Sequence, residues 1–145
     1  MPRQFVGASL RAIEKLYMEI LCPACWNETE ATHIVCGSCG TTIDLYSLEY
    51  ERRLVAELKR CSPERRIQIC EALGCRGKRS AVPALTELLQ DPEVSVCEAA
   101  IRGLGEIGDS SSADAVKKML AHDNGSIRGS ARYVLRSLLG SKAEL

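Results

Sequence analysis

A constant step of 31 residues, repeated between positions 66 and 135, is the feature that most restricts the fold of this chain. Three anchor positions recur at that step, and they are occupied by Arg66, Ile69 and Leu73, then by Cys97, Ala100 and Leu104, then by Arg128, Ala131 and Leu135. Apolar residues between the anchors keep the register, because Leu85 and Leu89 fall on Val116 and Leu120. A fixed period with two amphipathic segments is typical of stacked helical hairpins, since one hairpin cannot bury its own apolar face. The sequence therefore predicts a mainly α fold, a short α-α superhelix.

The composition narrows the class of protein. Lys plus Arg and Asp plus Glu both number 19 among 145 residues, so the total charge predicts no particular partner. No apolar run reaches the roughly 18 residues of a membrane span, and no apolar stretch with a small-residue cleavage site opens the chain. The eight cysteines then indicate metal ligands or reduced thiols rather than disulfides. We expect a cytoplasmic protein.

Four of the cysteines form two Cys-x-x-Cys pairs, Cys22 with Cys25 and Cys36 with Cys39, separated by ten residues. Two such pairs on tight turns can place four thiolates around Zn²⁺, each about 2.3 Å from the metal. The spacing predicts one structural zinc ion. An iron centre with the same ligands and a redox dithiol at the first pair are the alternatives. The remaining cysteines are interpreted as core or surface thiols, and they are Cys61, Cys70, Cys75 and Cys97.

The stretch around the cysteine pairs, residues 17–44, resembles the zinc-ribbon family. Its second pair has the form Cys-Gly-x-Cys-Gly, and short strands are expected at 17–21 and 31–35. Trp26 follows the first pair where a glycine often stands, which leaves the geometry of that turn open. The same residue is either part of a small core or an exposed anchor for a partner.

Many zinc ribbons bind nucleic acid, but the charge of this one argues against that role. No Lys or Arg lies between Lys15 and Arg52, whereas phosphate binding needs basic side chains. We therefore expect the ribbon to be a structural cap or a protein contact.

The chain divides into an N-terminal segment with a short helix (1–16), the ribbon (17–44) and a repeat domain (45–145). In the repeat domain, helix signals predict helices near 47–60, 63–73, 81–90, 92–104, 112–121 and 125–139. Gly74 and Gly105, one step apart, are expected to end two of these helices.

An apolar residue followed by Arg, then Ala and Leu, appears as Ile127-Arg128, Ala131 and Leu135. This pattern resembles the HEAT-like repeats of the phycobilisome-lyase type over residues 45–140. The resemblance implies that the Arg helps to join adjacent repeats by hydrogen bonds, which Cys97 is not expected to do. It does not fix the function, because such repeats serve lyases, scaffolds and regulatory subunits alike. Because two and a half repeats make a small surface and no catalytic constellation is recognisable, we expect no enzyme activity.

The second helix of each hairpin commonly lines the concave face of this fold. Candidate partner-binding residues there are Arg53, Glu87, Lys117 and Lys118, with Trp26 in the ribbon and a basic edge made by Arg76, Lys78 and Arg79. Because the signs on the concave face alternate, they favour a protein over a phosphate backbone. The sequence thus predicts a non-enzymatic adaptor for protein partners, and the alternative is a nucleic-acid-binding protein that uses the basic edge.

Overall fold

The computed structural model describes residues 19–30, 35–44 and 47–140. The helix expected in the N-terminal segment lies outside these residues. The chain forms two compact units, residues 1–50 and 51–145, which are considered separately below. The predicted boundary between residues 44 and 45 stays a prediction. Among the described residues, no helix combines the length and apolar character needed to cross a membrane.

The first unit contains a small antiparallel sheet. Strands β1 (Glu19–Leu21) and β2 (Glu28–Glu30) pair so that Ile20 lies opposite Thr29. The strand expected at 31–35 is described only at Val35, which pairs with Thr42 in an isolated bridge. A small core lies beside the sheet and consists of Leu21, Cys22, Cys36, Ile43 and Tyr50. The Tyr50 hydroxyl donates a buried hydrogen bond to the Leu21 carbonyl at 3.0 Å.

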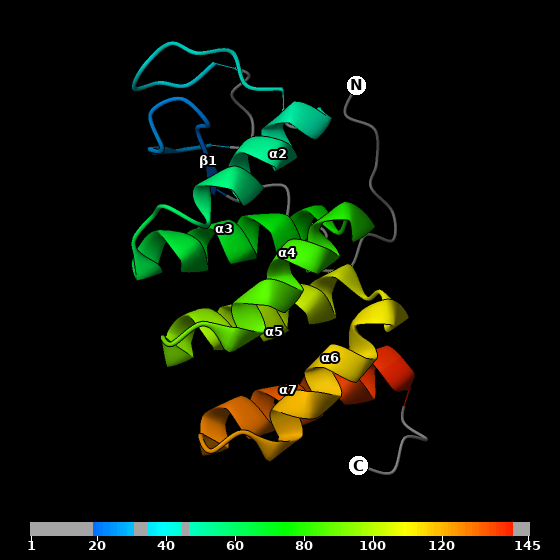
Figure 1. The fold of residues 1–145 in the computed structure, drawn as a ribbon. Coiled ribbons are helices and arrows are strands. Elements are labelled where there is room, and N and C mark those ends of the chain that lie inside the picture. Colours follow the sequence, from blue (N-terminus) through cyan, green and yellow to red (C-terminus); the bar gives the residue numbers. More distant parts are fainter. Residues whose placement is uncertain (1–18, 31–34, 45–46, 141–145) are drawn as a thin grey trace. The chain divides into compact units, whose positions relative to one another are not determined.

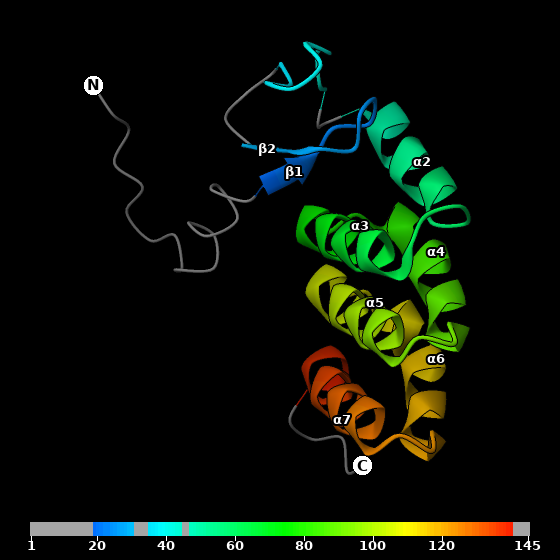
Figure 2. The ribbon, with the colours of Figure 1, turned by 90° about the vertical axis from the view of Figure 1, so that its left-hand side faces the viewer.

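The second unit is a stack of helical hairpins (Figures 1 and 2). Its helices are α3 (Pro63–Arg76), α4 (Val82–Glu87), α5 (Val94–Ile107), α6 (Ala113–Lys118) and α7 (Gly125–Leu139), together with α2 (Leu48–Glu57) from Glu51 onward. Short 3-10 turns flank α4 and α6, at Arg79–Ala81, Leu88–Gln90, Ser110–Ser112 and Met119–Ala121. Helices α3, α5 and α7 stack in one layer, while α4 and α6 lie in a second layer. The predicted mainly α fold is confirmed.

The anchor positions of the 31-residue step form the core of the second unit. All six apolar anchors are fully buried, and they are Ile69, Leu73, Ala100, Leu104, Ala131 and Leu135. Helix α5 packs on α3 at one side and on α7 at the other. Each hairpin therefore buries its apolar face on its neighbours, as the period predicts.

Two glycines one step apart end α3 and α5, but they are not the two that the sequence pattern suggested. The helices run to Gly77 (φ 64°) and Gly108 (φ 69°), both in the left-handed conformation that favours glycine at a helix end. Gly74 lies inside α3, where an added Cβ would come within 2.8 Å of the Cα of Gly103. Gly105 lies inside α5, where a Cβ would come within 2.9 Å of the Val134 side chain. These two glycines permit close helix packing.

The anchor position of Cys97 also differs from expectation. Arg66 Nε donates to the Leu58 carbonyl at 3.1 Å, and its Nη1 pairs with Asp91 at 3.0 Å. Cys97 Sγ donates to the Leu89 carbonyl at 3.4 Å, which lies one step after Leu58. The prediction that Cys97 cannot join adjacent repeats by a hydrogen bond is therefore wrong. The Cys97 thiol therefore makes a hydrogen bond equivalent to the one from Arg66 to Leu58. Its side chain is too short to make a second contact like that of Arg66 with Asp91.

The close approach at Gly74 gives a test of the packing. Gly74→Ala should lower the free energy of unfolding by about 1–3 kcal/mol, because the new methyl group meets backbone that cannot turn aside. Gly129→Ala is the matched control, since nothing lies within 4 Å of a Cβ at that exposed helical position. It should raise stability by about 0.5–1 kcal/mol through helix propensity. Urea unfolding measures both, and equal effects would contradict the packing role of Gly74.

Candidate metal centre

Two equivalent turns carry the four cysteines of the first unit. In the first turn, Cys22 N donates to Asn27 O and Trp26 N donates to Cys22 O, at 3.0 and 2.9 Å. In the second, Cys36 N donates to Thr41 O and Gly40 N donates to Cys36 O, both at 2.9 Å. The bonds of the second turn are those of the first, moved by 14 residues along the sequence. The two Cys-x-x-Cys pairs are therefore presented by the same local backbone fold.

Trp26 adopts the conformation that Gly40 adopts in the other turn. Its φ is 61° and that of Gly40 is 73°, and no other described non-glycine residue has a positive φ. The left-handed conformation costs an ordinary L residue about 1–2 kcal/mol. The tryptophan thus preserves the shape of the turn, which the sequence left open, at a cost in backbone energy.

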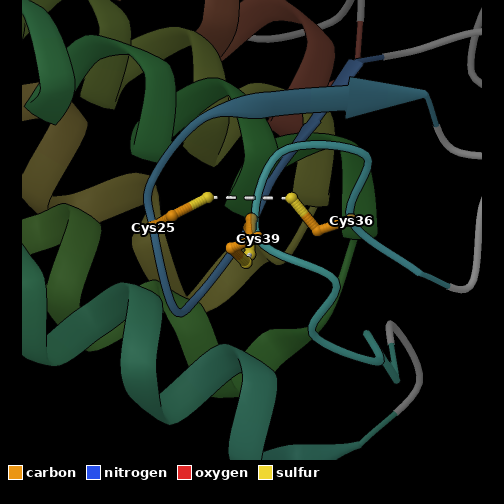
Figure 3. Close-up of side chains that lie close together, drawn as sticks. Cys25, Cys36 and Cys39 are labelled. Carbon is orange, nitrogen blue, oxygen red and sulfur yellow. Dashed lines mark hydrogen bonds between the residues drawn. The ribbon is translucent and has the colours of Figure 1, made fainter.

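The two turns bring the four cysteines together, as the sequence predicts. All four sulfur atoms lie within 4.8 Å of one another. Cys22 Sγ is 3.6 Å from Cys39 Sγ, and Cys25 Sγ is 3.7 Å from Cys36 Sγ. Figure 3 shows Cys25, Cys36 and Cys39 converging, with a dashed line from Cys25 to Cys36. We refer to these residues as the cysteine cluster.

The sulfur separations fit a metal ion. Four sulfurs held about 2.3 Å from a tetrahedral Zn²⁺ are about 3.8 Å apart, close to the 3.6 and 3.7 Å observed. A disulfide needs about 2.05 Å, so the four cysteines are free thiols. Soft sulfur ligands suit zinc and iron better than magnesium or calcium.

Neighbouring groups prepare part of the cysteine cluster for the charged state. The Thr41 hydroxyl, 3.2 Å from Cys39 Sγ, and then the Thr41 backbone N–H lower the pKa of Cys39 to about 6. Backbone N–H groups of Cys39 and Ser38 lower the pKa of Cys36. Thr41 is a supporting residue that sequence reasoning missed, although its place just after Cys39-Gly40 could have indicated it.

The pKa of Cys25 is shifted in the opposite direction. The backbone N–H of Asn27 favours its thiolate, but burial and hydrogen bonds with the other three sulfurs outweigh that effect and raise the pKa to about 12. Close thiolates repel one another, so the last proton is hard to remove without a cation. A bound divalent metal supplies that cation and displaces the proton.

The other cysteines have the thiol roles that were expected. Cys70 and Cys97 are buried in the second unit, and burial raises the pKa of both, to about 12 for Cys70. Cys61 and Cys75 are half-buried. Within residues 19–30, 35–44 and 47–140, the cysteine cluster is the only group of three or more potential ligands with the spacing of a metal site.

The candidate partner-binding residues lie in both units. Exposed side chains belong to Arg53, Arg79, Glu87, Lys117 and Lys118, while those of Trp26, Arg76 and Lys78 are half-buried. Arg79, the most exposed residue of the basic edge, pairs with Asp109 at 3.5 Å. Part of the positive charge of this edge is therefore balanced within the protein.

The cysteine cluster gives a direct metal prediction. Purified protein should contain about one zinc per chain by elemental analysis, since four thiolates complete a tetrahedral site. Cys36→Ser should lose the metal, whereas Cys61→Ser, which changes a thiol outside the cluster, should keep it. Protons compete with the metal for thiolates, so the bound fraction should fall as the pH falls. Metal-free protein after reconstitution would exclude the site.

The backbone of Trp26 can be tested separately from its side chain. Trp26→Gly and Trp26→Ala both remove the indole, but only glycine tolerates the left-handed φ without cost. We expect the glycine variant to bind Co²⁺ about fivefold more tightly than the alanine variant, which corresponds to about 1 kcal/mol. Spectroscopic titration with Co²⁺ measures the ratio. Equal affinities would show that the turn relaxes when the tryptophan is removed.

Comparison with known families agrees with the geometry of the second unit. A family profile described as HEAT repeats matches residues 51–136, which is more than half of the chain. No curated protein matches the sequence. The match covers α3 to α6 and most of α7, the same helices that carry the 31-residue step. This chain therefore belongs to the HEAT-repeat family.

Proposed function

We propose that this protein is a non-enzymatic adaptor, in which a zinc ribbon at residues 17–44 accompanies a HEAT-like stack that binds a protein partner. The observation that carries the proposal is the closed donor set of the cysteine cluster, with four sulfurs within 4.8 Å. Four thiolates fill a tetrahedral site and leave no position for a substrate water. We assign the metal as zinc and its role as structural.

The repeat family supports the partner class. HEAT repeats are generally non-catalytic and commonly bind proteins, and their extended surface follows from stacking. The exposed residues Arg53, Glu87 and Lys118 lie on successive second helices and carry both signs of charge. Mixed charges suit a protein surface better than a phosphate backbone, which is uniformly negative. The phycobilisome-lyase type stays a resemblance, and the cytoplasmic location stays an expectation.

A nucleic-acid-binding protein is the second candidate, and the exposed Arg79 favours it. The Arg79 side chain is 84% exposed, and Lys78 of the basic edge precedes it in the sequence. The ion pair of Arg79 with Asp109 reduces the charge that remains for phosphates. We therefore place this candidate behind the adaptor.

A titration separates the two functions. Duplex DNA and single-stranded RNA are titrated into the protein at 50 and 200 mM salt, and binding is followed by fluorescence anisotropy. Counterion release makes phosphate binding fall steeply with salt. The adaptor proposal expects weak binding that Lys78→Glu and Arg79→Glu do not change. Tight, salt-steep binding that these variants abolish would establish the second candidate instead.

A further inference from the structure

Helix α7 has a free face at the end of the stack. It packs on α5 and α6 through its buried side, which includes Ile127, Ala131 and Val134. Its opposite side is exposed, and in Figures 1 and 2 no helix of the second unit lies beyond it. We define the end face of α7 by the exposed residues Gly129, Arg132, Tyr133, Arg136 and Leu139.

The 31-residue step identifies the residues of α3 and α5 that correspond to the end face of α7. Arg132 corresponds to the buried Ile101 and Cys70, which lie one and two steps earlier. Arg136 corresponds to Gly105 and Gly74, the glycines of close helix packing. At these two positions α3 and α5 carry small or apolar residues, whereas α7 carries long cationic side chains. A further repeat cannot pack here in the way that α5 packs on α3.

The charge of this face is unbalanced. Helix α7 contains three arginines and no acidic residue. Arg128 is engaged, because its Nη1 donates to the carbonyls of His122 and Asp123, each at 2.7 Å. Among the residues that the structure describes, neither Arg132 nor Arg136 has an ion pair or a side-chain hydrogen bond. They lie one helical turn apart, where like charges repel.

Links between neighbouring helices of this layer pair an acid with a donor. Arg102 of α5 meets Glu71 of α3 at 3.7 Å, and Cys75 of α3 donates to Glu106 of α5 at 3.3 Å. Ser126 of α7 donates to Glu98 of α5. The end face of α7 carries arginine side chains, which can only donate, and no carboxylate for a contact of this kind with a further helix. A helix that packs there must bring the carboxylates.

Gly129 provides room for the backbone of such a helix. A Cβ at this position would have nothing within 4 Å, unlike those at Gly74 and Gly105. Glycine inside a helix lowers stability relative to alanine, and no contact within the described structure uses the space that it leaves. Tyr133, which is 69% exposed beside this position, belongs to a residue type that is enriched in protein interfaces.

We propose that the end face of α7 binds an acidic helical segment of a protein partner. Carboxylates one turn apart on that segment pair with Arg132 and Arg136, and its backbone approaches at Gly129. The inference rests on the proposed adaptor function and names a surface and a partner chemistry for it. Two unpaired cations are few for a phosphate backbone, whose binding grows with the number of charges neutralised.

The test selects a displayed library of 16-residue helical peptides on the wild-type protein and measures the peptides that bind. We expect selected sequences to be enriched in Asp or Glu pairs one helical turn apart. The double variant Arg132→Glu and Arg136→Glu should weaken their binding at least tenfold. The control is Lys59→Glu with Arg60→Glu, which makes the same charge change at two exposed positions just after α2 and should alter binding less than twofold.

A third variant tests the close approach without changing charge. Gly129→Leu should keep or raise the melting temperature, because the position is open, and should weaken peptide binding at least tenfold. The proposal is overturned by peptides without acidic pairs, by equal losses in the two charge-reversal variants, or by unchanged binding in Gly129→Leu. It is equally overturned if a 20-base-pair DNA duplex, or a second copy of the chain, occupies the face in an Arg132-dependent way. Peptide binding that ignores α7 would refute this surface while leaving the adaptor function intact.

Discussion

Burial between neighbouring helices is the constraint on which the second unit depends. Helix α5 buries apolar side chains on both sides, because it packs on α3 on one side and on α7 on the other. The helices approach closely since Gly74 meets the backbone of Gly103, and Gly105 meets Val134 one step later. In such a stack each element is stabilised by its nearest neighbours rather than by one central core. The 31-residue spacing of the sequence is the direct consequence of that requirement.

The first unit is stabilised in a different way from the second. Its described core holds only a few apolar side chains, among them Leu21, Ile43 and Tyr50. So small a core provides little free energy against the loss of chain entropy. Two turns of matching backbone geometry instead gather four sulfurs, and a metal bound there would link segments far apart in sequence. The left-handed Trp26 is consistent with this interpretation, because backbone strain persists where surrounding contacts determine the conformation.

The features that follow from a regular spacing in the sequence were predicted correctly. Features that depend on contacts between neighbouring helices were missed. Periodicity located the buried anchors, and cysteine spacing located the cluster, because both patterns follow from local geometry. The ends of α3 and α5 were misassigned, since Gly74 and Gly77 recur at the same step and the period cannot tell a packing glycine from a terminal one. The hydrogen bond of Cys97 was missed for a related reason. Its acceptor, the Leu89 carbonyl, belongs to another element and has no signature in the sequence.

Helix α7 differs from α3 and α5 in the residues that it presents on its outer side, because Arg132 and Arg136 stand where the earlier helices have small or apolar residues. An apolar end face would invite further copies of the repeat and lead to aggregation. Arg132 and Arg136 oppose such packing, because desolvating two unpaired guanidinium groups against an apolar helix is costly. The same two groups need not repel every helix, since one that brings carboxylates compensates the charge it buries. A cap against self-association and a selective surface for an acidic partner are thus two consequences of the same substitution, charged residues at positions that are otherwise small or apolar.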